Sequence, residues 1–250
     1  LEPDNAESWL GLATGWQAAG DVDRALRAAD RVEALGVESA VLHYLRAQIA
    51  FNQRADFEAS ERHARRALAL MEKAPALRHH LPGTYTLLGG ALWYAGKYEA
   101  CLATWREATS KLPLASQLHR VLAWSLAACP DPAYRDLDEA LRIAKAIHSA
   151  APSRQSLATL GHVHFHAGRY DEAARCLGQA MASLETLPAW LAEKQLLRSQ
   201  ALWRLGRKEE AKAALKVVED AAPRLLPAMP VRPQREDFER TLEAAREEIR

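Results

Sequence analysis

The sequence predicts an all-α protein made of about six successive helix pairs and one further C-terminal helix. The first observation is a recurring segment in which an apolar helical stretch stops at a glycine and a charged helical stretch follows: AAGDVDRAL at 18–26, YAGKYEACL at 94–102, HAGRYDEAA at 166–174 and RLGRKEEAK at 204–212. The second is a small residue at the same offset behind each glycine, namely Ala25, Cys101, Ala173 and Ala211. Such self-similarity is typical of stacked repeats, and each repeat here is expected to be a helix, a tight turn and a helix.

The six pairs are expected near residues 6–39, 41–74, 82–114, 116–152, 154–187 and 188–223. The first helix of the first, third and fifth pairs carries a regular series of positions: Trp9, Leu12, Ala13 and Trp16; Tyr85, Leu88, Gly89 and Leu92; Leu157, Leu160, Gly161 and His164. The second and fourth pairs keep a degenerate version: Tyr44, Ala47 and Phe51 with Ser60; Leu122, Ala123 and Leu126 with Ala140.

This spacing gives each helix one apolar face, because residues three and four apart lie on the same side of a helix. A single pair cannot bury that face, so the pairs must stack. A charge in place of Leu88 or Leu160 is therefore expected to cost at least the ~2–5 kcal/mol of a core truncation.

The connection between the two helices of the fourth pair, CPDPAYRD, is about five residues longer than that of the other pairs. Pro130 and Pro132 exclude a continuous helix there, so a projecting loop is expected. Asp136, followed three residues later by Glu139, resembles a capping box and predicts the start of the second helix.

Shorter segments complete the expected organisation at the two ends. Residues 1–5, LEPDN, are expected to be the tail of a preceding repeat, and the missing initiator methionine indicates a piece of a longer array or multidomain protein. Residues 224–234 are expected to form a proline-broken connector. Residues 235–250 are expected to form a capping helix with one apolar stripe made of Phe238, Leu242, Ala245 and Ile249.

The two series of positions resemble the W-x2-L-G-x2-Y and A-x3-F pattern of the tetratricopeptide repeat. The terminal proline of that pattern has counterparts at Pro3, Pro113, Pro152 and Pro223. The resemblance implies a right-handed superhelical α-solenoid. It also implies a non-catalytic protein–protein interaction module, since in such arrays the first helices of the pairs line a concave groove that holds an extended or helical peptide.

Carried over by repeat register, the resemblance implies a set of groove-facing residues: Gln17, Arg46, Asn52, Trp93, Tyr94, Arg120, Trp124, His162, Phe165, His166, Trp203 and Arg204. The large rings in this set would form an aromatic track flanked by three arginines. Tryptophan and arginine are the residue types that anchor interfaces most often, so the expected ligand is an apolar or aromatic peptide with some acidic character. The alternative is that the tryptophans pack within the superhelix.

One subtype of the family clamps a C-terminal carboxylate with lysine and asparagine at fixed first-helix positions. The corresponding residues in the first repeat are Leu10 and Thr14, and this departure argues against the binding of chaperone tails.

Three alternating histidines, His162, His164 and His166, raise the question of a metal site. The repeat register places His164 at the core tyrosine position and puts His162 and His166 together on the exposed face of the helix. A spacing of four can hold two metal ligands, but zinc requires three or four, and no third is evident. A polar groove surface is therefore favoured, and neither a metal nor a cofactor is expected.

Other candidate sites have simpler structural interpretations. The glycines at 83–90 lack the ending of a phosphate loop and are expected to serve helix packing. The acidic pairs at 21–23 and 136–138 stand where aspartate caps a helix. The basic cluster at 62–66 is expected to be a solvated convex face. No G-x-S-x-G or H-E-x-x-H motif occurs, so the chain is not expected to be an enzyme.

Composition limits the classes of partner. Thirty-three Lys and Arg residues against 32 Asp and Glu residues leave a net charge of +1, so nucleic acid is not an expected partner. The uncharged stretch at 81–96 contains a proline and is too short to span a membrane. Cys101, Cys129 and Cys176 are odd in number and widely spaced, which favours a reducing, cytoplasmic location over a disulfide framework.

Two alternatives to a peptide-binding module stay open. The chain could be a spacer or regulatory segment of a larger multidomain bacterial enzyme, kinase- or sensor-linked, because its insert resembles extended-loop repeats of such proteins. It could also be a self-assembling scaffold that associates through the open N-terminal repeat face near residues 1–9. Composition identifies neither the partner nor the oligomeric state.

Overall fold

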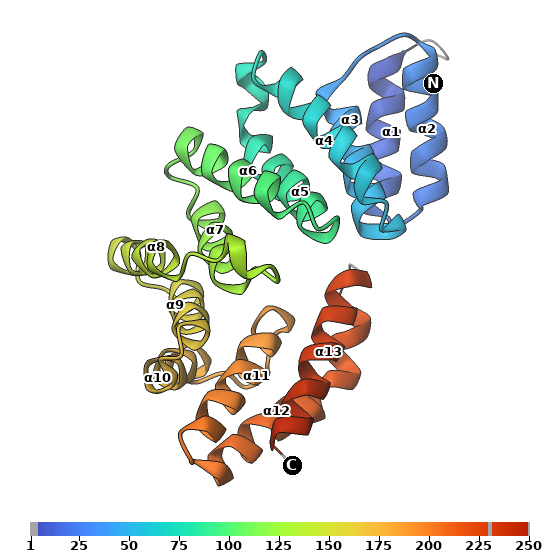
Figure 1. Ribbon diagram of the computed structural model, residues 1–250. Coiled ribbons are helices and arrows are strands. Elements are labelled where there is room, and N and C mark those ends of the chain that lie inside the picture. The colour runs from blue at the N-terminus through green and yellow to red at the C-terminus, as the bar shows by residue number, and fades with distance from the viewer. Residues whose placement is uncertain (1–4, 230–231, 250) are drawn as a thin grey trace. The chain divides into compact units, whose positions relative to one another are not determined.

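The computed structural model describes residues 5–229 and 232–249, and every regular element within these ranges is a helix (Figure 1). The prediction of an all-α helical-repeat solenoid is confirmed. The chain divides into two compact units, residues 1–108 and 109–250, each described here by itself. Of the expected repeat tail at residues 1–5, residues 1–4, with Pro3, lie outside the described residues, and Asn5 caps the first helix by accepting hydrogen bonds from the amides of Glu7 and Ser8. No helix in the described ranges combines the length and apolarity needed to cross a bilayer.

The first unit contains two complete helix pairs and most of a third. Helix α1 (Ala6–Ala18) pairs with α2 (Val22–Ala34), α3 (Ala40–Ile49) with α4 (Phe57–Met71), and α5 (Leu81–Tyr94) with α6 (Tyr98–Lys111). A short π-helix, η1 (Ala50–Arg54), continues α3, and a 3-10 helix, η2 (Pro75–His80), leads into α5.

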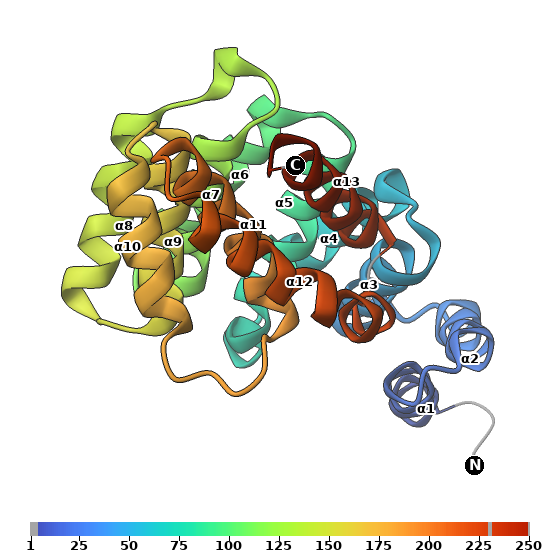
Figure 2. The same ribbon diagram turned by 90° about the horizontal axis from the view of Figure 1, so that it is seen from below.

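The second unit contains three helix pairs and a final helix. Helix α7 (Ser116–Ala128) pairs with α8 (Leu137–Ala150), α9 (Arg154–His166) with α10 (Tyr170–Met181), and α11 (Ala189–Arg204) with α12 (Lys208–Ala228). The 3-10 turn η3 (Pro132–Tyr134) lies between α7 and α8, and α13 (Arg232–Ile249) packs against α11 and α12. Figure 2 views the same helices from below.

The four glycines that mark the repeats all close the same type of turn. Gly20, Gly96, Gly168 and Gly206 have φ between +71° and +81°, a left-handed conformation that glycine adopts without steric cost. In each turn the glycine amide donates to a carbonyl three residues back, and the next amide donates to one five residues back, as from Asp21 to Trp16 at 2.9 Å. This pair of bonds satisfies carbonyls that a helix end otherwise leaves open.

Two repeats depart from this turn in ways that keep the following helix in register. In the second pair, Ala55 takes the left-handed conformation in place of glycine, and η1 accommodates one additional residue, as π-helical turns do. In the fourth pair, the Asp136 amide still donates to the Leu126 carbonyl, at 3.1 Å, across the insert. The insert itself is folded, because Arg135 Nε donates to the Cys129 carbonyl at 2.6 Å.

Several second helices begin at aspartate caps, as expected for the acidic pairs. Asp21 accepts a hydrogen bond from the Arg24 amide, Asp56 from the Ala59 amide and Asp136 from the Glu139 amide, at 2.8–3.0 Å. Each bond satisfies one of the free amides of the first helical turn.

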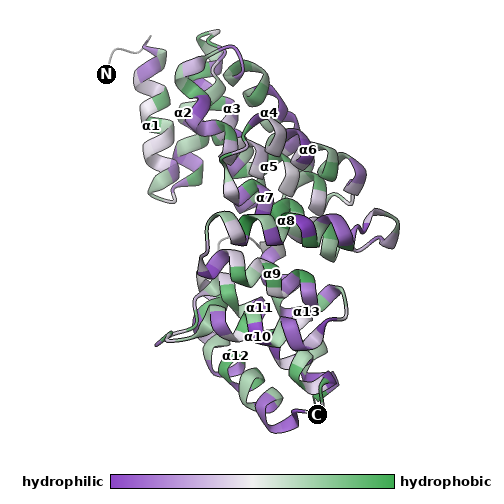
Figure 3. Cartoon of the chain, turned by 90° about the vertical axis from the view of Figure 1, so that its left-hand side faces the viewer, coloured by the Kyte–Doolittle hydropathy of each residue, from purple (hydrophilic) through white to green (hydrophobic). Residues whose placement is uncertain are grey.

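Small residues let the two helices of a pair approach closely. A Cβ added at Gly89 would lie 2.2 Å from the Trp105 ring, and one added at Gly161 would lie 2.6 Å from Leu177. Cys101 is buried and its thiol donates to the Gly89 carbonyl at 3.3 Å, consistent with a small core residue. Labelled helices in Figure 3 mix hydrophilic and hydrophobic positions, as helices with one buried face do.

The two leucines expected to be equivalent in the core are not equivalent. Leu88 is buried, but Leu160 is only half-buried and keeps contact with solvent. The expectation that Leu160 is a fully buried core position is therefore wrong, and a charge there would stay partly hydrated.

The C-terminal region differs from the expected proline-broken connector. Helix α12 runs through Pro223 and Pro227 to Ala228, so most of 224–229 is helical. Burial of Ala222 and Leu225 offsets the hydrogen bonds that the prolines remove. Helix α13 begins at Arg232, and its stripe is buried in the same cluster: Phe238, Leu242, Ala245 and Ile249.

The substitution Gly89→Ala is expected to lower the free energy of unfolding by about 1–3 kcal/mol, because the added methyl forces Trp105 out of its position. Gly11→Ala is the matched control, since a Cβ there meets nothing within 4 Å. This exposed helical change is expected to raise stability by up to about 1 kcal/mol. Urea denaturation followed by circular dichroism measures both, and equal effects would contradict the close-packing interpretation.

Candidate functional site

The predicted groove residues are divided between the two units. Five belong to the first unit, namely Gln17, Arg46, Asn52, Trp93 and Tyr94, and seven belong to the second, namely Arg120, Trp124, His162, Phe165, His166, Trp203 and Arg204. Eleven of these lie on first helices, whereas Asn52 lies in η1. Several of the second-unit residues contact one another, whereas those of the first unit mainly contact other residues of their own unit.

In the first unit, the predicted residues are largely engaged by their own chain. Arg46 donates to Asp30 at 2.7 Å and lies 3.0 Å from Glu33, both on α2, and its side chain is only 15% exposed. The Tyr94 ring stacks on Phe57 at 5.4 Å between centroids and contacts Phe51. The charge of Arg46 is therefore balanced internally, and Tyr94 is part of an aromatic packing cluster.

Trp93, Gln17 and Asn52 complete the first-unit set. The Trp93 ring meets Tyr98 edge-on at 5.4 Å, and all three residues are half-buried. Thr14 is one of the two residues that differ from the carboxylate-clamp subtype. Its hydroxyl donates to carbonyls of its own helix.

In the second unit, rings from α7, α9 and the start of α10 form a continuous cluster, called the inner cluster: Trp124, His162, Phe165, His166 and Tyr170. Neighbouring ring centroids lie 4.6–5.9 Å apart, from Trp124 to His162, His162 to His166, His166 to Phe165, and Phe165 to Tyr170. Such distances are typical of favourable aromatic contacts. Trp124 and His166 are half-buried, so the cluster reaches the surface.

The prediction that His162 shares an exposed face with His166 is wrong. His162 is 1% exposed and His164 is 6% exposed, so only His166 keeps contact with solvent. The cause is the packing of α7 and α11 on either side of α9, which places Trp124 and the Glu193–Lys194 pair beside the His162 ring.

His162 is buried without hydrogen bonds from the described residues. Neither Nδ1 nor Nε2 has a partner, and Glu193 Oε1 lies 4.0 Å from Nδ1. Glu193 is itself paired with Lys194, whose Nζ lies 2.5 Å from Oε2. A buried polar group without a hydrogen bond costs roughly 1–3 kcal/mol, so this imidazole is an energetic weak point of the cluster.

The histidine environment opposes protonation. Burial, reinforced by His166 and Lys194, lowers the pKa of His162 well below its usual value. Burial likewise lowers the pKa of His166 to about 4, with Glu193 opposing this change and Arg135, Lys194 and Arg204 adding to it. Arg135 belongs to the insert of the fourth repeat, so the insert contributes positive charge near the inner cluster.

The described part of the chain holds no group of three or more His, Cys, Asp or Glu side chains arranged for a metal ion. His162 and His166 stand four residues apart, but the carboxylate beside them is engaged by Lys194. His162 is the buried member and His166 the partly accessible member of the inner cluster.

Arg204 borders the inner cluster and is the residue with the most contacts among the predicted arginines. Its guanidinium lies 5.1 Å from the Phe165 ring centroid and 4.9 Å from that of Tyr170. Nη1 donates to the Tyr170 hydroxyl at 2.7 Å, and Nε donates to Glu248 of α13 at 2.8 Å. These hydrogen bonds, that to Glu248 above all, raise the pKa of Arg204.

Arg120 on α7 and Trp203 on α11 complete the predicted residues of the second unit. Arg120 is half-buried on α7, one turn before Trp124, and its Nη1 donates to Ser116 Oγ at 3.2 Å. Burial lowers the pKa of Arg120, and no carboxylate in the described part of the chain opposes this change. Trp203 is half-buried beside the core of the unit, with the Lys208 ammonium 5.2 Å from its ring centroid. Trp203 is thus packed against the core in part and accessible in part, so both interpretations of the tryptophans apply to it.

Two residues of this site were not predicted from the sequence. Tyr170 stands directly after the repeat turn, where the recurring HAGRYDEAA segment could have indicated it. Glu248 lies in the last turn of α13, and nothing in the local sequence indicates that it reaches Arg204.

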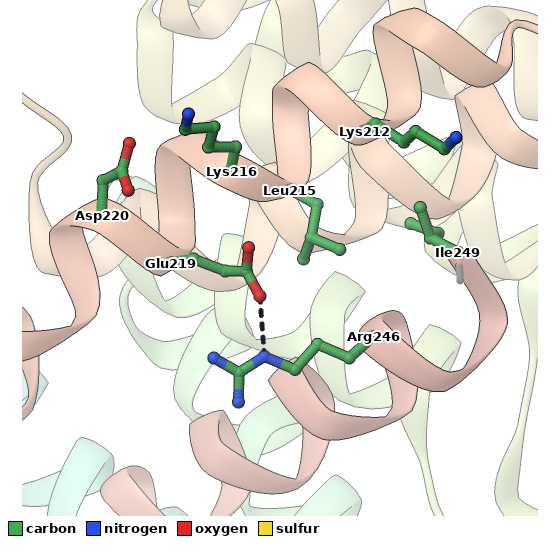
Figure 4. A pocket seen from close by; sticks show the side chains of 7 residues that line it. All are labelled: Lys212, Leu215, Lys216, Glu219, Asp220, Arg246 and Ile249. Atoms are coloured by element: carbon green, nitrogen blue, oxygen red, sulfur yellow. Dashed lines mark hydrogen bonds and ion pairs between the residues drawn. The ribbon is translucent and has the colours of Figure 1, made fainter.

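Two hollows of the described surface lie away from the predicted groove residues. They are shallow depressions of about 450 and 570 Å³ that follow the seam between α12 and α13. Figure 4 shows the first of them, where Arg246 donates to Glu219 at 2.8 Å between charged side chains. Neither depression contains a predicted groove residue, and their open, charged lining is unlike a small-molecule pocket.

The basic cluster at 62–66 is a charged surface with internal partners. Arg65 donates to Glu61 at 3.0 Å, and Arg66 pairs with Glu38. The His63 ring faces His43, with 3.1 Å between their Nδ1 atoms. These contacts favour the solvated-face interpretation over an anion site.

Comparison with known proteins identifies the repeat type. The family model described as tetratricopeptide repeat matches residues 195–224, which cover the second half of α11 and most of α12. No curated protein matches the chain in sequence.

Solved structures share the fold at low sequence identity. The apo form of RapI superimposes with a TM-score of 0.62 at 15% identity, covering 98% of both chains. The C-terminal part of a TPR repeat-containing protein from Cytophaga hutchinsonii gives a TM-score of 0.60 at 12% identity, covering 96% of this chain and 93% of that one. These likenesses concern the fold alone. Together with the family match, they confirm the predicted repeat type.

The buried histidines make stability depend on pH. The folded-state pKa values of His162 and His166 are lowered, so the unfolded chain binds more protons below its ordinary histidine pKa of about 6.5. Their contribution is present above pH 6.5 and is lost as the pH falls toward 4. For His166 alone, the loss is on the order of 3 kcal/mol at about 1.4 kcal/mol per pKa unit.

His162→Leu is expected to make the free energy of unfolding less dependent on pH between 6.5 and 4, because it removes one of the histidines whose pKa is lowered by burial. Gln155→Leu, at an exposed position of the same helix, is the control, because it adds a leucine without removing a titratable group, and it should leave the dependence as in the parent. Urea titrations at several pH values measure the slope. An unchanged slope in His162→Leu would show that this side chain does not resist protonation.

Proposed function

We propose that this tetratricopeptide-repeat chain is a protein–protein interaction module and that its inner cluster binds an extended peptide segment of a partner protein. Tetratricopeptide folds are generally non-catalytic and serve such interactions, and the family match and shared fold support this class of function. The finer assignment, a peptide against the first helices of the second unit, depends on the residues described above.

The observation that carries the proposal is the partly accessible aromatic cluster, in which the half-buried rings of Trp124 and His166 lie next to the buried imidazole of His162. Its two ring nitrogens lack hydrogen bonds, while Trp124 and His166 beside it keep contact with solvent. Apolar or aromatic side chains of a peptide can pack on the accessible parts of the Trp124 and His166 rings, while its backbone groups remain hydrated or bind polar groups at the surface. Aromatic side chains with a polar edge are also the groups that most often dominate interface energies.

The nearby charges favour a peptide with some acidic character. Arg120, on the same helix as Trp124, donates to Ser116, and Arg135 and Lys194 act electrostatically on His166 from two other sides. Complementary charge of this kind raises association rates and selects against basic partners.

A peptide library screened against the parent and against Arg120→Ala with Trp124→Ala tests the proposal. The double variant is expected to lose at least tenfold in affinity for the enriched motif, because an interface anchor typically contributes 2 kcal/mol or more.

The matched control is Arg142→Ala with Trp190→Ala, which removes the same residue types from exposed positions outside the cluster. Circular dichroism checks that all three proteins unfold at similar temperatures. Equal enrichment with both double variants would contradict binding at the inner cluster, and no enrichment with any protein would overturn the peptide-binding proposal.

A second candidate function, self-association, is favoured by the exposed face of α1. The positions of the later first helices that face the preceding second helix are buried, for example Leu42, Leu45 and Ile49 on α3, and Thr84, Leu87 and Ala91 on α5. Their counterparts on α1 are Ser8, Gly11 and Gly15, and a Cβ at either glycine meets nothing within 4 Å among the described residues. This face has the shape to receive a helix of a second copy.

Self-association predicts a mean mass that rises with protein concentration. Gly15→Arg is expected to hold the mass at that of a single chain, because a long charged side chain blocks close helix approach. Arg27→Gly, at an exposed position of α2, leaves that face of α1 unaltered and is the control. Light scattering after size-exclusion chromatography measures the mass. A parent mass of 27.7 kDa at all concentrations would exclude this candidate.

A further inference from the structure

Arg204 is the centre of a preassembled carboxylate site. Its Nε donates to Glu248 Oε1 at 2.8 Å, and Nη2 lies 3.5 Å from Oε2, so one guanidinium faces both oxygens. Gln200, one turn earlier on α11, donates its amide to Glu248 Oε2 at 2.8 Å. Phe165 and Tyr170 lie beside the guanidinium, and the Tyr170 hydroxyl accepts from Nη1. Paired donors of this kind recognise a carboxylate by its planar geometry.

The carboxylate that fills this site comes from the C-terminal helix of the same unit. Glu248 lies in the last turn of α13, and its side chain remains 26% exposed. The helix is held independently by the buried residues Phe238, Leu242, Ala245 and Ile249. Glu248 can therefore leave Arg204 by rotation of its own side chain, without release of the helix.

We infer that Arg204 is the anchor for an acidic side chain of the partner peptide and that Glu248 is an internal competitor which occupies this anchor until the peptide displaces it. The inference rests on the proposed function and adds the chemical class of the ligand: a peptide with an Asp or Glu next to an apolar residue. The carboxylate would replace Glu248 between Arg204 and Gln200, and the apolar neighbour would lie along Phe165 and His166, whose rings are 5.5 Å apart.

The inference has a direct energetic consequence. A tethered carboxylate competes at a high effective concentration, so a peptide binds only in the fraction of molecules in which Glu248 has left. Removal of the competing charge is expected to tighten the binding of acidic peptides by about 3- to 10-fold, since apparent affinity scales with the competent fraction. Peptides without an acidic residue should be unaffected.

The test compares the parent, Glu248→Gln and the matched control Glu247→Gln, an exposed neighbour on the same turn of α13. The probe is a library of C-terminally amidated dodecapeptides in which each Asp- or Glu-containing peptide is paired with its Asn or Gln equivalent. Glu248→Gln is expected to bind acidic members 3- to 10-fold more tightly than the parent does. Glu247→Gln should match the parent, and Arg204→Gln should lose the preference for acidic members over their amide equivalents.

Hydrogen exchange of residues 232–249 distinguishes loss of the competitor from loss of the helix. If α13 is released in Glu248→Gln, Glu248→Asp is used, because a shorter carboxylate keeps the charge but reaches Arg204 less well. Peptides that bind all variants equally would overturn the inference while the proposed function stands. An absence of peptide binding in every protein would overturn the proposed function and the inference with it.

Discussion

The close approach of the two helices within each pair is the contact on which the structure depends. It requires a small residue on each helix where they cross, and a turn short enough to bring the second helix straight back. Gly89 and Gly161 meet the first requirement, because a methyl group at either would overlap a neighbouring side chain. The left-handed glycine turns meet the second. With these two features in place, the two helices of a pair share an apolar face, and this face is buried when a neighbouring pair packs against it.

This packing has a consequence for the polar residues on the first helices. Side chains that a single repeat would leave exposed become enclosed when the next pair is added, and their hydrogen-bonding groups then need partners. Arg46 finds two carboxylates on α2, and Arg204 finds one on α13. His162 finds none among the described residues. His162 is thus a buried polar side chain that the described part of the fold leaves without a hydrogen bond, and the burial of its neutral form explains why histidine protonation opposes folding.

The C-terminal helix has two roles that follow from one position. Its apolar stripe closes the core of the last pair, and its last turn delivers Glu248 to the edge of the inner cluster. A cap that buries the end of the array lies beside the last first helix, which here carries Arg204. The inferred competition between the cap and a partner would follow from this position of α13.

The amino-acid pattern by itself determined the repeat, the helix boundaries near each glycine turn, the aspartate caps and the extra residues of the fourth pair. These features depend on neighbours within about ten positions, where helical spacing and the conformational freedom of glycine act directly.

Only the tertiary structure decided that His162 is buried, that Leu160 is not, that α12 continues through Pro223, and that Arg204 is occupied by Glu248. Each of these depends on which side chain of another helix comes to lie opposite. For Glu248 and Arg204 that contact joins residues 44 positions apart, beyond the reach of any local pattern.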